Sequence, residues 1–228
     1  MTDKIRVAIL EDHQSITDGY LYRLNATPNI EVAATLAFGE DLEPTLGRSP
    51  VDVLLLDVNV PTAEDNTNAF PILFLIPKLL ERYPELNVLV ISMHAERGLI
   101  KAVMEAGASG YILKDDRTSI QDLGNLVVSI ANGGIYLSQK AHQLLLYDRT
   151  DKNDKPLTPR QIEVLSLCAA YPDSSLGELA SKLGVSNSTI RNLLSGAYIR
   201  IGVHTRAAAI AKAHELGIVS PQTPALQT

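Results

Sequence analysis

Four short apolar segments of this sequence lead directly into side chains that can bind a cation or a phosphoryl group. Glu11 and Asp12 follow the first segment, Asp57 follows the second, the third ends in Ser92, and Lys114 follows the fourth. Such segments are typical of buried strands in a parallel sheet, whose carboxyl ends meet at one edge. We therefore expect these groups to converge on one patch. Carboxylates crowded in this way repel one another unless a divalent cation lies among them, and their oxygen atoms suit Mg²⁺.

This set of residues resembles the receiver domain of bacterial response regulators, in which Asp57 would be the phosphoacceptor. The resemblance implies that Lys114 acts as a point charge for the phosphoryl oxygens and that Ser92 hydrogen-bonds one of them. It also implies that Ser92 and Tyr111 are the switch residues that respond to phosphorylation. A Mg²⁺ ion would be held by four residues: Glu11, Asp12, Asp57 and, through its backbone carbonyl, Asn59.

The first half of the chain alternates five times between strand and helix patterns. This alternation predicts a flavodoxin-like doubly wound sheet of five parallel strands, covered by helices on both faces. Strands are expected near residues 4–10, 30–36, 52–57, 87–92 and 110–113. Helices are expected near residues 14–26, 39–47, 69–83, 95–107 and 116–132. The receiver domain would occupy residues 1–138.

Length and composition agree with two domains in a cytoplasmic protein. The chain has 228 residues, a length that exceeds the usual size of a single domain. Hydrophobic residues make up 46% of it. Its single cysteine, Cys168, cannot form an internal disulfide and is interpreted as a small core residue. The first apolar run is too short for a signal peptide, and no run reaches the length of a membrane span. We expect no membrane partner.

The second half changes character after residue 138. Residues 139–156 end in a dense polar run and are interpreted as a linker, and residues 220–228 as a tail. Between them, residues 157–219 contain capping-box patterns at Thr158 and Ser175. Apolar side chains then recur at helical spacing on both sides of Gly184. Two amphipathic helices around a glycine turn predict a small all-α domain with a helix-turn-helix.

The segment from Leu157 to Val219 resembles the LuxR-type DNA-binding domain. The resemblance rests on residues 157–165, 178–180, 183–186, 189–191 and 201–203, together with Arg206. Together with the receiver half, it points to the NarL/FixJ subfamily of response regulators. The alternative for this half is a helical bundle that binds only protein.

Side chains off the apolar stripe of the second motif helix are expected to face outward and to contact DNA. Arg191 could bind a guanine edge or a phosphate, Asn192 suits adenine, and hydroxyls at the helix start can donate to phosphates. The candidate set is Asn187, Ser188, Thr189, Arg191, Asn192 and Ser195. Leu193 departs from the family, because a histidine is usual there; Ser195 stands where a base-reading lysine can occur.

The resemblance implies a transcription regulator that is not an enzyme. A sensor histidine kinase would phosphorylate Asp57, and the active protein would form a homodimer that binds a double-stranded DNA operator and contacts the transcription machinery. In this subfamily the unphosphorylated receiver can also mask the DNA-binding face. A hydrolase of the haloacid dehalogenase type is disfavoured, because such enzymes carry a second aspartate where Asn59 stands. A regulator controlled by ligand or protein binding remains an alternative, supported by the lengthened acidic loop 62–68.

Overall fold

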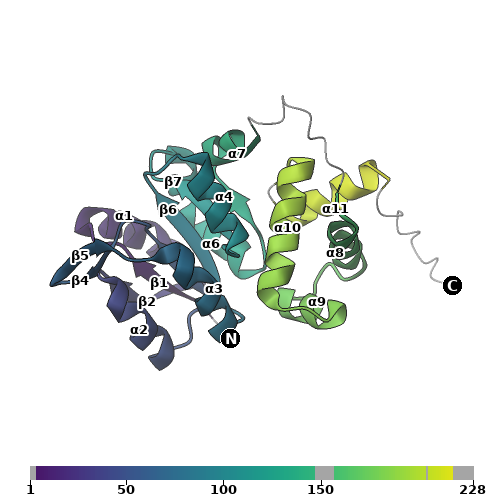
Figure 1. The fold of residues 1–228 in the computed structure, drawn as a ribbon. Coiled ribbons are helices and arrows are strands. Elements are labelled where there is room, and N and C mark those ends of the chain that lie inside the picture. Colours follow the sequence, from purple (N-terminus) through teal and green to yellow (C-terminus); the bar gives the residue numbers. More distant parts are fainter. Residues whose placement is uncertain (1–3, 147–156, 204, 218–228) are drawn as a thin grey trace.

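The computed structural model describes residues 4–146, 157–203 and 205–217, which form a receiver-like α/β domain and a helical module (Figure 1). The strands are β1 (Ile5–Leu10), β2 (Ile30–Leu36), β3 (Val53–Leu56), β4 (Pro61–Ala63), β5 (Asn66–Ala69), β6 (Asn87–Ser92), β7 (Gly110–Leu113) and β8 (Tyr136–Leu137). The helices of the first domain are α1 (Gln14–Asn25), η1 (Gly39–Asp41), α2 (Leu42–Arg48), α3 (Ile72–Arg82), α4 (Arg97–Glu105), α5 (Arg117–Gln121), α6 (Leu123–Ala131) and α7 (Gln139–Leu146). Those of the module are α8 (Pro159–Ala170), α9 (Leu176–Leu183), α10 (Asn187–Ile201) and α11 (Arg206–Glu215).

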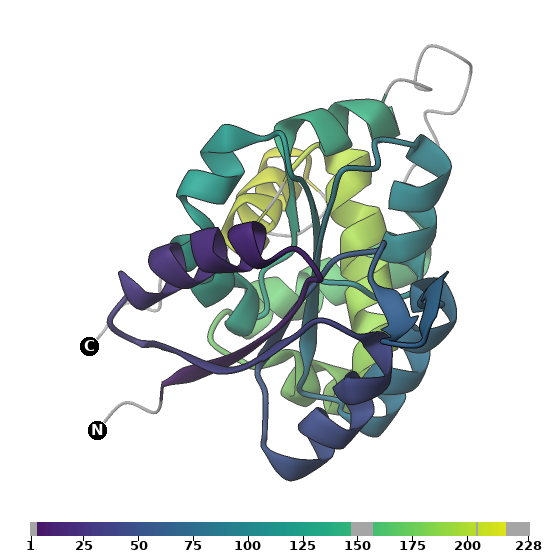
Figure 2. The same ribbon diagram turned by 90° about the vertical axis from the view of Figure 1, so that its left-hand side faces the viewer.

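The central sheet is parallel, in the order β2-β1-β3-β6-β7-β8, and lies between two layers of helices (Figure 2). The inner strands β3 and β6 are wholly buried, as their nearly continuous apolar sequences require. One core lies against α1 and α6, where Tyr20, Leu24 and Val127 pack on the sheet. The other lies against α2, α3, α4 and α7. The predicted doubly wound sheet is therefore confirmed.

Three features extend the predicted domain. Where a lengthened acidic loop was expected, β4 and β5 form a small antiparallel hairpin after β3. The short strand β8 adds a sixth strand beside β7. Residues 139–146, expected to begin the linker, form α7 instead, which packs against α4 and β7. The rest of the expected linker, residues 147–156, lies outside the described residues, as does the whole of the expected tail.

The helical module has the expected caps. Thr158 and Ser175 each form the reciprocal hydrogen bonds of a capping box at the start of α8 and α9. Gly184 ends α9 with φ of 67°, a left-handed conformation that favours glycine, and so makes the turn to α10.

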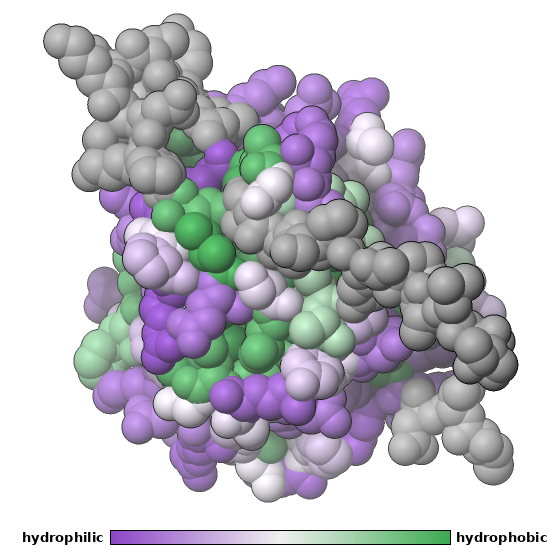
Figure 3. All heavy atoms as spheres, turned by 90° about the vertical axis from the view of Figure 1, so that its right-hand side faces the viewer, coloured by the Kyte–Doolittle hydropathy of each residue, from purple (hydrophilic) through white to green (hydrophobic). Residues whose placement is uncertain are grey.

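The face of the module that is turned away from the first domain has apolar side chains gathered in its middle between polar ones (Figure 3). No helix in the described part of the chain is long and apolar enough to span a membrane.

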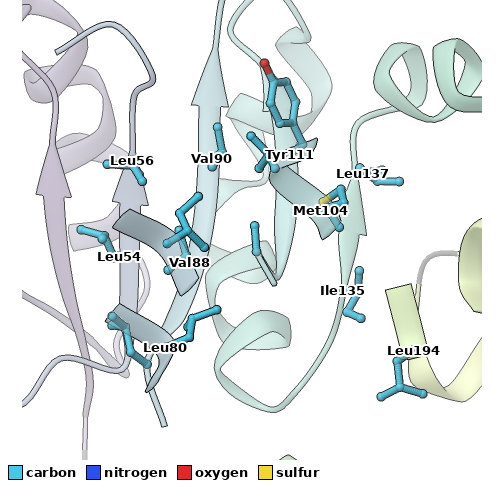
Figure 4. Close-up of a cluster of buried hydrophobic side chains, with 14 of the residues drawn as sticks. Leu54, Leu56, Leu80, Val88, Val90, Met104, Tyr111, Ile135, Leu137 and Leu194 are labelled. Carbon is cyan, nitrogen blue, oxygen red and sulfur yellow. The ribbon is translucent and has the colours of Figure 1, made fainter. Parts of the chain in front are cut away.

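The two parts share one apolar core. Leu194 of α10 is fully buried in the same cluster as Leu54, Val88 and Tyr111 of the sheet and Met104 of α4 (Figure 4). Helix α10 lies between the first domain and the other helices of the module (Figure 1) and contacts α3, α4 and α7. The second helix of the helix-turn-helix is thus packed against the receiver-like domain.

Candidate functional site

Lys114 joins two buried carboxylates at the carboxyl edge of the sheet. Its Nζ lies 2.6 Å from Oε2 of Glu11 and 2.8 Å from Oδ2 of Asp57. The backbone N–H of Asp57 donates to the carbonyl of Leu10 at 3.0 Å, which holds the ends of β1 and β3 in register. Burial lowers the pKa of Lys114, but the hydrogen bonds and charges of Asp57 and Glu11 outweigh it, so this pKa is raised overall. The lysine is therefore a protonated cation beside Asp57.

Asp12 and His13 continue the acidic edge towards solvent. Nδ1 of His13 lies 2.9 Å from Oδ1 of Asp12 and 3.2 Å from Oε1 of Glu11. The charge of Asp12 raises the pKa of the exposed His13 imidazole above its ordinary value. One ligand atom from each of Glu11, Asp12 and His13 lies within 4.8 Å of the others. His13 was not among the expected ligands, although it follows the two acids directly in the sequence.

The oxygen ligands at this edge of the sheet suit a hard divalent cation. Glu11, Asp12 and Asp57 supply more negative charge than Lys114 balances, and carboxylate oxygens are preferred ligands of Mg²⁺. Asn59, the fourth expected ligand through its carbonyl, is exposed just beyond β3 on the same edge. The placement is compatible with the expected ligand set of Glu11, Asp12, Asp57 and Asn59.

Ser92 and Tyr111 are both fully buried and are linked through one loop residue. The Ser92 hydroxyl accepts a hydrogen bond from the backbone N–H of His94 at 3.1 Å. The Tyr111 hydroxyl donates to the carbonyl of His94 at 2.8 Å. Burial raises the pKa of Tyr111, so the phenol stays neutral and keeps its proton for this bond. The loop that precedes α4 is therefore fastened to both expected switch residues.

The expected DNA-contact surface of α10 is covered in this structure. Arg191 and Ser195 are only 2% and 3% exposed, so the expectation that they face outward is wrong here. Nη2 of Arg191 donates to Oδ1 of Asn87 at 3.2 Å and more weakly to the carbonyl of Pro84 at 3.4 Å. The apolar periodicity of α10 correctly separates the side chains that pack in the module core from those on the opposite face of the helix. The first domain, however, packs on that opposite face.

Three of the remaining expected DNA contacts, the half-buried Asn187 and Ser188 and the exposed Asn192, lie near the first domain. Asn187 donates from Nδ2 to the carbonyl of Pro84 at 2.9 Å and to Oε1 of Glu85 at 3.0 Å. A Cβ atom built at Gly107 would lie 3.5 Å from Oδ1 of Asn192 and 3.8 Å from Cβ of Ser188. These three α10 residues therefore contact or closely approach the first domain.

The start of α10 depends on a residue that the sequence analysis did not single out. Ser186 is the N-cap, and its hydroxyl accepts from the backbone N–H of Thr189 at 3.2 Å. The Ser186 hydroxyl also lies 2.8 Å from the hydroxyls of Ser188 and Thr189. Its place just before the apolar stripe is the usual signal for such a cap. Leu193 is half-buried and packs against the shared core.

Two family models match the chain. Residues 7–123 match the response regulator receiver domain, and residues 155–200 match sigma-70 region 4, a helix-turn-helix family. The sequence is 32% identical to the transcriptional regulatory protein MctR of Rhizobium johnstonii, covering 95% of this chain and 96% of the relative. It is 30% identical to DegU of Brevibacillus brevis, again covering 95% and 96% of the two chains.

Solved structures share the fold. One is RcsB of Salmonella enterica serovar Typhimurium, bound to promoter DNA in the presence of the phosphomimetic BeF3⁻. It has a TM-score of 0.57 and 23% identity, covering 94% of this chain and all of that one. Another describes two RcsB dimers bound to two parallel DNAs, with a TM-score of 0.57 and 22% identity. At these identities the likeness shows a receiver sheet followed by a helix-turn-helix module.

Proposed function

This chain belongs to the response regulators, as its receiver match and its full-length relatives show, and from that premise we propose a phosphorylation-controlled mechanism of DNA binding. Family membership makes it a transcription regulator rather than a dehalogenase-type hydrolase. We propose that a sensor histidine kinase transfers a phosphoryl group to Asp57. The active form would be a homodimer that places two helix-turn-helix modules on a near-palindromic DNA operator and contacts the transcription machinery.

The charge arrangement around Asp57 supports its role as phosphoacceptor. The Asp57 carboxylate would attack the phosphorus of the phosphohistidine, and the bond from phosphorus to the imidazole nitrogen would break. Lys114 is already 2.8 Å from Oδ2 of Asp57 and can follow the added oxygens as a cation. Glu11, Asp12 and the Asn59 carbonyl would hold a Mg²⁺ ion with Asp57, and this ion supplies charge neutralisation for the phosphoryl oxygens when bound.

The burial of Arg191 is the observation that carries the proposed control. A side chain that is bound to Asn87 and Pro84 cannot at the same time contact a base edge or a DNA phosphate. The described arrangement would therefore be the inactive state, in which the receiver masks the recognition helix. Shifting such an equilibrium from mostly closed to mostly open needs about 5.5 kcal/mol of differential stabilisation. A few charge-assisted hydrogen bonds to a phosphoryl dianion can supply that amount.

A series of contacts connects Ser92, which ends the strand next to β3 at the same sheet edge as Asp57, with the covered helix. Ser92 accepts the N–H of His94 in the described state, and Tyr111 holds the carbonyl of the same residue. A phosphoryl oxygen that recruits the Ser92 hydroxyl would release this loop, which leads directly into α4. Helix α4 packs against α10, so a shift of the loop and α4 would loosen the contact that covers Arg191.

The direct test is phosphorylation of the purified full-length chain by acetyl phosphate, with and without Mg²⁺, followed by intact-mass measurement. One phosphoryl adduct is expected with Mg²⁺, and it should be absent from Asp57→Asn. Asp115→Asn is the matched control, because this exposed aspartate beside Lys114 pairs with Lys140 and has no expected role. An adduct that persists in Asp57→Asn would refute the assignment. Absence of any adduct would favour the regulator controlled by ligand or protein binding.

A further inference from the structure

The carboxylate of Glu85 lies where the receiver meets the helical module, in the turn between α3 and β6. Its Oε1 accepts a hydrogen bond at 3.0 Å from Nδ2 of Asn187, the first residue of α10. The same oxygen lies 2.9 Å from a Cβ atom built at Gly177, the second residue of α9. One receiver carboxylate is therefore next to the starts of both helices of the helix-turn-helix.

This position brings a negative charge to a part of the module that favours one. The N-terminal end of a helix carries partial positive charge from its free N–H groups. Arg191, further along α10, is a buried cation; burial lowers its pKa to about 10, and the charge of Glu85 opposes this. Helix N-termini, asparagine amides and arginines are also the groups that bind DNA phosphates. The receiver thus presents to the module a charge like that of a phosphate.

The glycine at position 177 is explained by the same contact. Glycine within a helix is unfavourable relative to alanine, and Gly177 does not have the positive φ that would require glycine. A methyl group at this position would meet Oε1 of Glu85 first, whereas the side-chain atoms of Asn187 would lie 3.6 and 3.7 Å away. A residue without a side chain therefore allows the Glu85 carboxylate to approach α9.

We propose that Glu85 is an electrostatic latch of the closed state, a carboxylate that binds the helix-turn-helix in place of a DNA phosphate. The same turn supplies two uncharged acceptors, the carbonyl of Pro84 to Asn187 and Arg191, and Oδ1 of Asn87 to Arg191. Glu85 adds the charge. Because its side chain is exposed, removing that charge changes the open fraction of the protein without unfolding it. Competition with DNA rests on the proposed function, whereas the latch itself does not.

The test measures opening without DNA. Ser195 is 3% exposed and lies one turn beyond Arg191 on α10, so Ser195→Cys provides a thiol that becomes accessible when the domains separate. The rate of its alkylation by iodoacetamide in the unphosphorylated full-length protein, followed on the labelled peptide by mass spectrometry, reports the open fraction. Adding Glu85→Lys should raise this rate about tenfold, because repulsion from Arg191 replaces attraction. An unchanged rate would overturn the proposal.

Two further variants separate the contact of Glu85 from a general effect of charge. Glu81→Lys makes the same change of charge on the exposed face of α3 and should be alkylated like the parent protein. Gly177→Ala should raise the rate by a smaller factor, because its methyl group displaces the Glu85 carboxylate. Alanine favours the helix, so such a rise cannot come from a weakened α9. Equal rates in Glu81→Lys and Glu85→Lys, or no rise in Gly177→Ala, would contradict the proposed contact.

Titration with operator DNA separates this proposal from the proposed function. If the receiver masks the recognition helix, Glu85→Lys should raise the DNA affinity of the unphosphorylated protein, relative to Glu81→Lys, by about the same factor as the alkylation rate. Faster alkylation without tighter DNA binding would support the latch and would refute the masking. Failure of Asp57 to accept a phosphoryl group would refute the phosphorylation mechanism and would leave the alkylation result unchanged.

Discussion

Nη2 of Arg191 lies 3.2 Å from Oδ1 of Asn87, so a residue of the recognition helix is hydrogen-bonded to the first residue of a central receiver strand. Asn87 is itself 5% exposed and is held by further hydrogen bonds to the carbonyls of Asp52 and Glu85. The receiver therefore offers Arg191 a rigid acceptor. In the proposed mechanism, DNA must replace this acceptor with a base edge or a phosphate.

Arg191→Ala should abolish specific operator binding by the phosphorylated protein and leave its thermal stability almost unchanged. The side chain supplies the expected base or phosphate contact, and in the closed state the two unmet donors of this buried cation offset the packing that its removal loses. Fluorescence anisotropy with an operator selected from random duplexes measures the binding, and calorimetry measures the melting. A large fall in melting temperature would show that Arg191 stabilises the closed fold.

Leu194→Ala should destabilise the protein by about 2–5 kcal/mol, since it removes a fully buried side chain from the core that joins the two domains. The neighbouring Leu193 is only half-buried, so Leu193→Ala should cost less, below about 2 kcal/mol. Denaturant titration of both variants gives the comparison. Equal losses would contradict the packing of α10 described above.

Ser92→Ala should accept a phosphoryl group at Asp57 but lose most of the gain in dimerisation and DNA binding. The hydroxyl contacts the N–H of His94 in the closed state, so its expected part is to transmit phosphorylation to the loop before α4. Intact mass reports the adduct, and sedimentation reports the dimer. A phosphorylated Ser92→Ala protein that dimerises like the wild type would exclude this route.

The ion pairs of Lys114 should make stability fall at high pH. The pKa of Lys114 is raised above its ordinary value of 10.5 in the folded protein, so its stabilisation is complete below pH 10.5 and is lost as pH rises through the folded pKa. Lys114→Met should be less stable at neutral pH, and the difference from the wild type should shrink above pH 10.5. Melting curves of both proteins from neutral to alkaline pH test this. A difference that stays constant with pH would be a packing effect instead.

The sequence predicted the sheet and the convergence of Glu11, Asp57 and Lys114 at its carboxyl edge, because both depend on local patterns. Apolar runs define the buried strands, and the polar residue that ends each run marks the edge, which is how Asp57 and Lys114 were found. The β4–β5 hairpin was missed because residues 62–68 are polar except for Ala63 and show no apolar alternation. The burial of Arg191 by the receiver could not be predicted from the sequence. Its hydrogen-bond acceptor Asn87 is 104 positions away, and the periodicity of a helix does not indicate what packs on its polar face.

The most direct test of receiver gating is a reversible cross-link between Gly107 of the receiver and Ser188 of α10. A Cβ atom built at Gly107 lies 3.8 Å from Cβ of Ser188, a separation suited to a disulfide. Gly107 has φ of 103°, so Gly107→Cys carries some strain, and the Gly107→Cys single variant is the control. The only natural cysteine, Cys168, is buried in the module.

The Gly107→Cys/Ser188→Cys protein should be oxidised, phosphorylated, checked by intact mass and titrated with operator DNA before and after reduction. Comparing one protein with itself removes any effect of the lost Ser188 hydroxyl on DNA contacts. The account predicts that the oxidised, phosphorylated protein does not bind the operator and that reduction restores binding. Equal operator affinity of the oxidised and reduced forms would contradict the claim that the receiver gates DNA binding by covering the recognition helix.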